Sequence, residues 1–192
     1  MEIVAAEPRL YLWTKDEYYQ MAEMGLFDGK RVELIGGQVL EMSPMRSGHA
    51  TATMLVAQAL QRILPSAYFQ RIQLPLSVSE FSDPEPDVAV VEGAVRDYAD
   101  AHPATAALVV EVADSSLDYD QTEKASLYAS AGVADYWVVN LPQRRLEVFR
   151  SPIGDASQPF GYGYASRQTL TADKTIQPLF ADDSLSVAEL LP

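Results

Sequence analysis

The sequence predicts an α/β or α+β fold in which one sheet is accompanied by few helices. Two observations predict it. The expected elements follow the order helix, hairpin, helix, three strands, helix and further strands, and no glycine-rich phosphate loop follows any of the strands. That order excludes an eight-fold barrel, and the missing loop disfavours nucleotide-cofactor folds. A chain of 192 residues most simply forms a single domain spanning residues 1–192.

The N-terminal third is predicted to form a helix, a hairpin and a second helix. Thr14 begins a capping-box pattern, and Gly25 can end the helix that follows it. Residues 31–42 contain two short apolar runs around a Gly-Gly pair, which is typical of a tight hairpin. Apolar residues then recur at helical spacing over about 48–64 until Pro65 closes the segment.

The rest of the chain is predicted to be mostly strands. A helix is expected where polar and apolar residues alternate with helical period, and a surface loop where glycine, proline and serine gather. The expected elements are strands over 68–78, 86–93 and 106–113, a helix over 118–133, a hairpin over 135–150, a loop over 151–163, a strand over 166–170 and a short helix from Ser186.

Three acidic residues, Glu33, Asp87 and Glu111, interrupt runs that otherwise read as strands. A lone ionised carboxylate in an apolar layer costs several kcal/mol unless a cation compensates it. One such acid could simply face water at a strand end, but three together favour a shared site. Lys124 lies at the centre of the helix face that should pack on the sheet, so we expect it to pair with Glu111.

Carboxylates and a lysine at strand ends suit hydrolysis assisted by a metal ion. Mg²⁺ and Mn²⁺ accept a few oxygen ligands and keep water in the remaining positions. Such an ion activates water and offsets charge on a phosphoryl oxygen, while an ammonium group stabilises developing charge. Structural ion pairing uses the same residue types, so the residues alone leave both interpretations open.

Pro86-Asp87, and the glutamate that ends VVE at Glu111, resemble the PD-(D/E)xK nuclease superfamily. More closely, the stretches VELIGGQVLEMSP, PEPDVAVV and LVVEVADSSLDYDQTEKASLYASAGVADYWVVN are similar to the Uma2 family (domain of unknown function 820) over about 31–150. The resemblance implies a restriction-endonuclease-like mixed sheet flanked by helices, and a DNA endonuclease that uses Mg²⁺ or Mn²⁺.

The resemblance also implies roles for individual residues. Asp87 and Glu111 would be metal ligands, Glu33 would complete the acidic site, and Lys124 would be the catalytic lysine. The superfamily usually places that lysine two residues after the glutamate, but this chain has it on the following helix. His49 matches a histidine at the start of the second helix, where a substrate contact or a structural role is expected.

The net charge of −13 is the main argument for other functions, because such a chain repels polyanions at long range. A catalytically silent DNA- or protein-binding module on the same fold, or a hydrolase of small phosphodiesters, are the alternatives. A glycosidase is disfavoured, because no aromatic cluster suggests a sugar cleft. The lack of cysteine, of a signal peptide and of a long apolar run predicts a cytoplasmic chain with no membrane segment, and a homodimer would help it cut both DNA strands.

Overall fold

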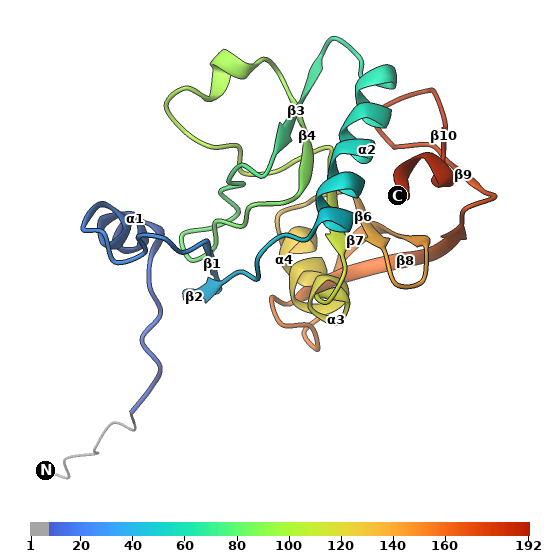
Figure 1. The fold of residues 1–192 in the computed structure, drawn as a ribbon. Coiled ribbons are helices and arrows are strands. Elements are labelled where there is room, and N and C mark those ends of the chain that lie inside the picture. Colours follow the sequence, from blue (N-terminus) through green and yellow to red (C-terminus); the bar gives the residue numbers. More distant parts are fainter. Residues whose placement is uncertain (1–7) are drawn as a thin grey trace, which may run out of the picture.

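The protein is described by a computed structural model that covers residues 8–192 (Figure 1). Its centre is a six-stranded sheet with the order β3-β4-β5-β6-β7-β8. β5 and β6 run parallel, and every other neighbouring pair is antiparallel, so the sheet is mixed. The strands are β3 (Tyr68–Ile72), β4 (Val88–Glu92), β5 (Leu108–Ala113), β6 (Asp135–Asn140), β7 (Arg145–Gly154) and β8 (Tyr162–Thr171).

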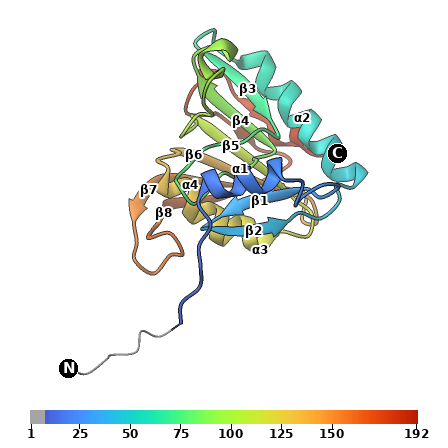
Figure 2. The ribbon, with the colours of Figure 1, turned by 90° about the vertical axis from the view of Figure 1, so that its left-hand side faces the viewer.

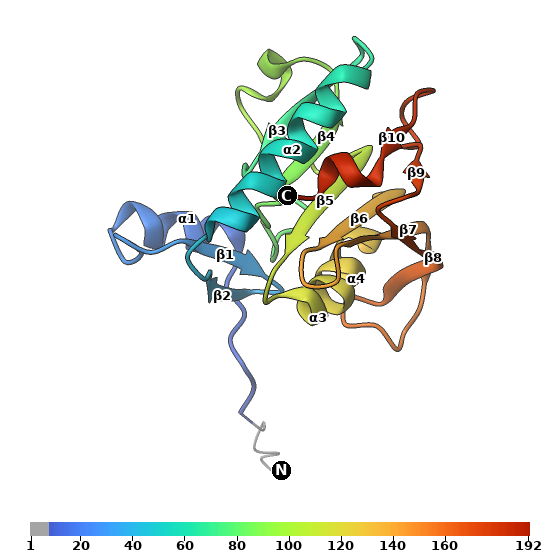
Figure 3. The same cartoon turned by 45° about the vertical axis from the view of Figure 1, so that its right-hand side comes forward.

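Helices cover both faces of this sheet (Figure 3). α2 (Ser47–Ile63) and the 3₁₀ turn η3 (Val187–Leu190) pack on one face. The other face is covered by one continuous helical stretch, which consists of α3 (Leu117–Tyr119), the π-helical turn η2 (Asp120–Lys124) and α4 (Ala125–Ser130). α4 lies against β7 and β8. This arrangement confirms the α/β (α+β) class.

Strand alternation decides which side chains face which layer. In β5, Val110 and Val112 enter the core under α2, whereas Val109 joins the core on the α3–α4 side. Glu111 alternates with Val110 and Val112, so it faces the same side as Val109. Asp87 stands just before β4 and opposite Glu111 in the antiparallel register that pairs Val88 with Val110. The two acids therefore share one face of the sheet.

The N-terminal elements form a separate unit against the sheet (Figure 2). The capping box at Thr14 is present and starts α1 (Lys15–Glu23). β1 (Val32–Ile35) and β2 (Gln38–Glu41) form the expected hairpin. Leu34 makes an isolated antiparallel bridge with Asp83, and this bridge ties the hairpin to the segment that leads into β4. The hairpin thereby carries Glu33 toward the acid-bearing strands.

The expected strand over 68–78 is too long. β3 ends at Ile72, because Gln73 has a φ of 51° and its N–H is shared between the carbonyls of Pro86 and Asp87. Pro75 also lacks a backbone donor, so it could not extend the ladder. The consequence is functional, because the turn brings the Gln73 side chain to Asp87.

The expected loop over 151–163 is partly wrong. β7 continues to Gly154 and β8 begins at Tyr162, with Pro152 paired to Tyr164. Ser151 has a φ of 62°, but the register is the same on both sides of it, so the hairpin continues past this residue without a bulge. Glycine, proline and serine here mark an irregular hairpin and not a loop.

Four further differences are small. The helix expected over 118–133 contains the π turn, and the C-terminal helix is the 3₁₀ turn η3. The 3₁₀ turn η1 (Val95–Tyr98) and the short pair β9 (Thr175–Ile176) and β10 (Leu185–Ser186) have no counterpart in the sequence prediction. Within residues 8–192, none of the helices has the length and apolar character needed to cross a membrane.

Candidate active site

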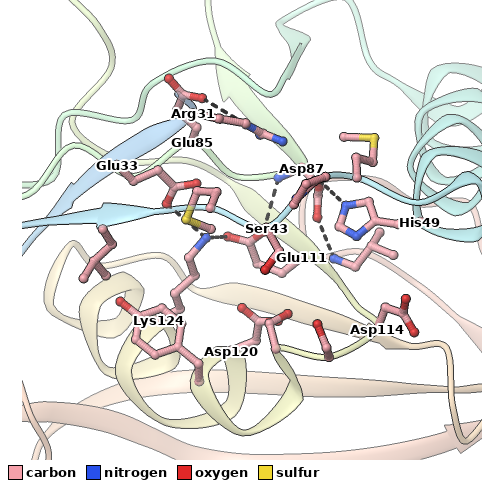
Figure 4. Close-up of a pocket in the computed structure, with 18 of the residues that line it drawn as sticks. Arg31, Glu33, Ser43, His49, Glu85, Asp87, Glu111, Asp114, Asp120 and Lys124 are labelled. Atoms are coloured by element: carbon pink, nitrogen blue, oxygen red, sulfur yellow. Dashed lines mark hydrogen bonds and ion pairs between the residues drawn. The ribbon is translucent and has the colours of Figure 1, made fainter. Parts of the chain in front are cut away.

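Glu111 is the centre of a buried group of polar side chains on the α3–α4 side of the sheet (Figure 4). Its Oε1 accepts hydrogen bonds from Lys124 Nζ at 2.9 Å and from the Tyr128 hydroxyl at 2.6 Å. Its Oε2 accepts the backbone N–H of Asp87 at 3.3 Å. Only 4% of Glu111 is exposed. The strongly apolar run around Glu111 therefore contains a carboxyl group whose two oxygens both accept hydrogen bonds from neighbouring elements.

Asp87 is held just as firmly on the adjacent strand. Its Oδ2 accepts the backbone N–H of Val112 at 2.9 Å. His49 Nε2, from the first turn of α2, lies 2.8 Å from Asp87 Oδ1, and Gln73 Nε2 donates to the same oxygen at 3.2 Å. Burial opposes ionisation of Asp87, but these hydrogen bonds and the nearby imidazole outweigh it and lower the pKa. Asp87 is therefore an ionised carboxylate with a fixed orientation.

Lys124 reaches the site because of the π-helical turn. A π turn is wider than an α turn, and such turns are frequent at functional sites. It places Lys124, 3% exposed, between two acids that belong to different elements. Nζ lies 2.9 Å from Glu111 Oε1 and 3.2 Å from Glu33 Oε2, and the second contact lacks hydrogen-bond geometry. The ion pair expected between Lys124 and Glu111 is thus present, and Glu33 joins it.

Asp120 adds a further buried carboxylate one turn before Lys124. Its Oδ2 accepts a hydrogen bond from the Ser116 hydroxyl at 2.6 Å, and its backbone carbonyl accepts the Tyr136 hydroxyl at 2.8 Å. Burial raises the pKa of Asp120, although Lys124 and Ser116 oppose the shift. Ser116 and Asp120 therefore line the site, whereas Asp118 is exposed on the outside of the helix.

The pKa values in this cluster are shifted by burial and by the charges of the neighbouring groups. Burial raises the pKa of Glu111 to about 8, against the opposing effect of Lys124, and Asp87, Asp120 and Glu33 add to the rise. Burial would lower the pKa of Lys124, but Glu111, Glu33 and Asp120 raise it well above the usual value. Lys124 is therefore a permanent ammonium group, and the cluster keeps an excess of negative charge.

These residues open into a hollow of about 470 Å³. All four residues expected to form the site, and His49 as well, line it. The other carboxylates in its wall belong to Glu41, Glu85, Asp114 and Asp120, and its other Lys or Arg side chains are Arg31 and Arg46. Arg31 lies 3.9 Å from Glu85. Arg31 and Arg46 thus lie at the hollow, whereas Lys30, Arg62, Arg71, Arg144 and Arg145 lie elsewhere.

Two residues that contact the acids were not predicted from the sequence. Tyr128 lies one turn after Lys124 on the same helix face, and this position was the one indication of its contact. Gln73 had no such signal, because its approach to Asp87 depends on the left-handed backbone at that residue. Over residues 8–192, no group of three or more His, Asp or Glu side chains is close enough to hold a metal ion as the side chains stand.

Comparison with known proteins gives a consistent result. The family model described as "Uma2: Putative restriction endonuclease" matches residues 15–188. The crystal structure of "a putative nuclease belonging to DUF820" from Anabaena variabilis ATCC 29413 matches with a TM-score of 0.69 and 15% sequence identity. That match covers 92% of this chain and 96% of the other, and at this identity it shows the shared fold. None of the curated proteins matches the chain.

Proposed function

The chain belongs to the Uma2 family of restriction-endonuclease-type proteins, and we propose that it hydrolyses phosphodiester bonds in DNA with Mg²⁺ or Mn²⁺ as cofactor. One observation supports this most strongly. Asp87 and Glu111 stand opposite each other on adjacent strands, and each accepts a backbone N–H from the other strand. They lie in a hollow beside a permanently charged lysine. Such a pair of oriented carboxylates is what a small, hard cation requires.

The donor set fits such a cation in its chemistry. All the candidate ligand atoms are carboxylate oxygens, which Mg²⁺ and Mn²⁺ prefer. Mg²⁺ is commonly bound through only one or two carboxylates, and water completes its coordination shell. The Glu111 carboxyl group is already oriented by Lys124 and Tyr128 at Oε1 and by the backbone N–H of Asp87 at Oε2. More carboxylates than Lys and Arg side chains line the hollow. Asp87 and Glu111 would therefore hold the ion.

Each remaining residue would have a definite task. A bound divalent ion supplies an activated water and offsets charge on the phosphate. The Lys124 ammonium would orient the nucleophile or stabilise the charge that develops on the phosphoryl oxygens. Glu33 would hold Lys124 in place from the opposite side. His49 would fix the orientation of Asp87, which makes it a positioning residue.

Nicking of supercoiled plasmid by the purified protein in Mn²⁺ tests this function. Wild type should nick, and Lys124→Met should reduce the rate at least about 100-fold, because methionine keeps the volume and removes the charge. Lys174→Met is the matched control, since Lys174 is exposed, pairs with the equally exposed Asp173 and does not line the hollow. Wild-type protein that cleaves neither the plasmid nor a single-stranded DNA circle, or equal rates for wild type and Lys124→Met, would contradict the proposal.

A catalytically silent module is the second candidate, and one observation favours it. Lys124 lies within ion-pair distance of both Glu111 and Glu33, as it would in a purely structural ion pair. This candidate predicts that neither plasmid nor a small diester such as bis(p-nitrophenyl) phosphate is hydrolysed, and that Mn²⁺ does not raise the melting temperature. A hydrolase of small phosphodiesters would instead cleave the small diester and leave the plasmid intact.

A further inference from the structure

The carboxylates of the candidate site lie at the bottom of a hollow and not on an open groove. Asp87, Glu111, Glu33 and Lys124 are between 2% and 5% exposed. The chain between β2 and α2, residues 42–46, forms part of the wall. A volume of about 470 Å³ is typical of a pocket for a small ligand. A phosphate within a stiff duplex, flanked by its paired bases and neighbouring phosphates, would have to leave the duplex path to reach these acids.

The chain also has too few available Lys and Arg side chains to form a binding surface for duplex DNA. Proteins that bind duplex DNA through its backbone neutralise several phosphates with Lys and Arg. Of the fourteen Lys and Arg residues, eight lie within 4.0 Å of a carboxylate: Lys30, Arg31, Arg62, Lys124, Arg145, Arg150, Arg167 and Lys174. Among the residues that line the hollow, Arg46 is the one Lys or Arg for which no such carboxylate is found within residues 8–192. One or two phosphate contacts are what this surface can supply.

The same hollow has an apolar part that the carboxylate chemistry does not use. Leu40, Met42, Met45 and Tyr119 line it together with the acids. Met45 is 38% exposed, so its flexible thioether is available for contact. The flat faces of nucleobases pack on such side chains, but in a duplex those faces are covered by the neighbouring base pairs. An unpaired base has them free.

Resting on the proposed function, we infer that the substrate is single-stranded DNA, one nucleotide of which enters the hollow. Its base packs against Met42 and Met45 at the outer wall. Its phosphate lies toward Asp87 and Glu111, and Arg46 neutralises a neighbouring phosphate at the rim. This substrate needs few basic contacts and tolerates a protein of net charge −13, because its bases supply part of the binding.

Cleavage of oligonucleotides of one sequence in Mn²⁺, single-stranded or fully paired, tests the inference directly. We expect at least tenfold higher kcat/KM for the single strand. The logarithm of kcat/KM should fall against the logarithm of salt concentration with a slope of about −1, as for one or two phosphate contacts. Equal or faster cleavage of the duplex, or a slope steeper than about −4, would overturn the inference.

Two variants test whether the base lies in the hollow. Met45→Ala should raise KM for the single strand several-fold with little change in kcat. Met54→Ala is the control, because Met54 is exposed on α2 and does not line the hollow. The same two substitutions can be compared for binding alone by fluorescence anisotropy with a labelled single strand. Lys124→Met then serves as the background, so that the strand is not cleaved. Equal KM values for wild type and Met45→Ala would contradict the placement.

The outcomes also separate this inference from the function on which it rests. Mn²⁺-dependent cleavage of the duplex alone would leave the nuclease function standing and remove the single-strand preference. Cleavage of neither oligonucleotide would remove both. Preferential cleavage of the single strand, lost in Lys124→Met, would support both.

Discussion

Two groups of buried acids lie on the same six-stranded sheet, and they differ in how their charge is compensated. In β6, Asp135 is fully buried. One of its oxygens accepts Trp137 Nε1 and Arg150 Nε at 2.8 Å each, and the other accepts Arg150 Nη2 at 3.1 Å and the backbone N–H of Leu179 at 2.9 Å. Arginine thus binds this carboxylate through two nitrogens, and both oxygens are occupied.

Glu147 in β7 is compensated in the same way, on the opposite face of the sheet from Asp135. It is fully buried, and its Oε1 accepts Arg145 Nε at 2.6 Å while its Oε2 accepts the Thr169 hydroxyl at 2.7 Å. Arg167 Nη2 lies 3.6 Å from Oε2. Neither Asp135 nor Glu147 lines the hollow. In this group bases equal or outnumber acids, and nothing is left for a ligand to neutralise.

The group around Glu111 has the opposite balance. Its one internal base, Lys124, is a point charge between two acids, and the neighbouring carboxylates open into the hollow. A buried carboxylate is therefore not in itself a sign of a functional site. What distinguishes the site is uncompensated negative charge next to accessible space, and the following predictions test that distinction.

The largest expected difference between the two groups is in activity. Glu111→Gln should reduce plasmid nicking in Mn²⁺ by at least about 1000-fold, because the amide is a poor ligand for a hard cation. Glu147→Gln should leave the rate per folded molecule within about threefold of wild type, since Glu147 lies outside the hollow. Comparable losses in the two variants would show that both effects come from damaged folding.

The free energy of unfolding should change more on substitution of an arginine-paired acid than on substitution of Glu111. Asp135→Asn should lower the free energy of unfolding by about 3–5 kcal/mol, because Arg150 would lose the carboxylate that neutralises it in the sheet. Glu111→Gln should cost less without metal, because burial already disfavours the ionised form of Glu111. Urea denaturation in EDTA measures both values. A greater loss for Glu111→Gln than for Asp135→Asn would break the comparison.

A smaller effect is expected at Tyr128, which donates to Glu111 at 2.6 Å. Tyr128→Phe keeps the ring in the core and removes this bond, so it should cost about 1–2 kcal/mol of stability. It should also weaken Mn²⁺ binding several-fold, because Glu111 loses part of its fixed orientation. Tyr162→Phe is the control on an exposed tyrosine. The same Mn²⁺ affinity in both variants would argue against the positioning role.

The last prediction needs no substitution and concerns the pH dependence of metal binding. A metal ligand must give up its proton, and burial raises the pKa of Glu111 to about 8. Mn²⁺ affinity should therefore rise with pH by up to about tenfold per unit below pH 8 and level off above it. Calorimetric titration between pH 6 and pH 9 measures this. Affinity that is constant over that range would mean that Glu111 does not ligate the ion.

The sequence predicted the pairing of Glu111 with Lys124 because both residues break a strong pattern. A glutamate within an apolar strand and a lysine at the centre of an apolar helix face each need a partner, and one connection joins them. Glu33 and Asp87 followed from the same reasoning. Tyr128 conforms to the pattern of a core aromatic residue, so its hydroxyl contact gave no signal in the sequence.

Asp135 and Glu147 show the limit of that reasoning. Asp135 begins β6, and Glu147 interrupts the apolar run of β7. Arg150 and the backbone of Leu179 reach Asp135 from elsewhere in the chain, as Thr169 and Arg167 reach Glu147, and local periodicity does not encode such long-range contacts. The early end of β3 and the irregular hairpin at Ser151 depend on left-handed residues other than glycine. Such residues carry no turn signature, so the boundaries there could not be predicted.

Isothermal titration of Mn²⁺ into wild type, Glu111→Gln and Glu147→Gln tests the central claim most directly, because it needs no substrate. We expect wild type and Glu147→Gln to bind Mn²⁺ with similar affinity and Glu111→Gln to lose the binding heat. Binding of equal affinity in all three proteins, or in none of them, would contradict the claim that the acids around Glu111 hold a catalytic cation while those of the arginine-paired group only stabilise the sheet.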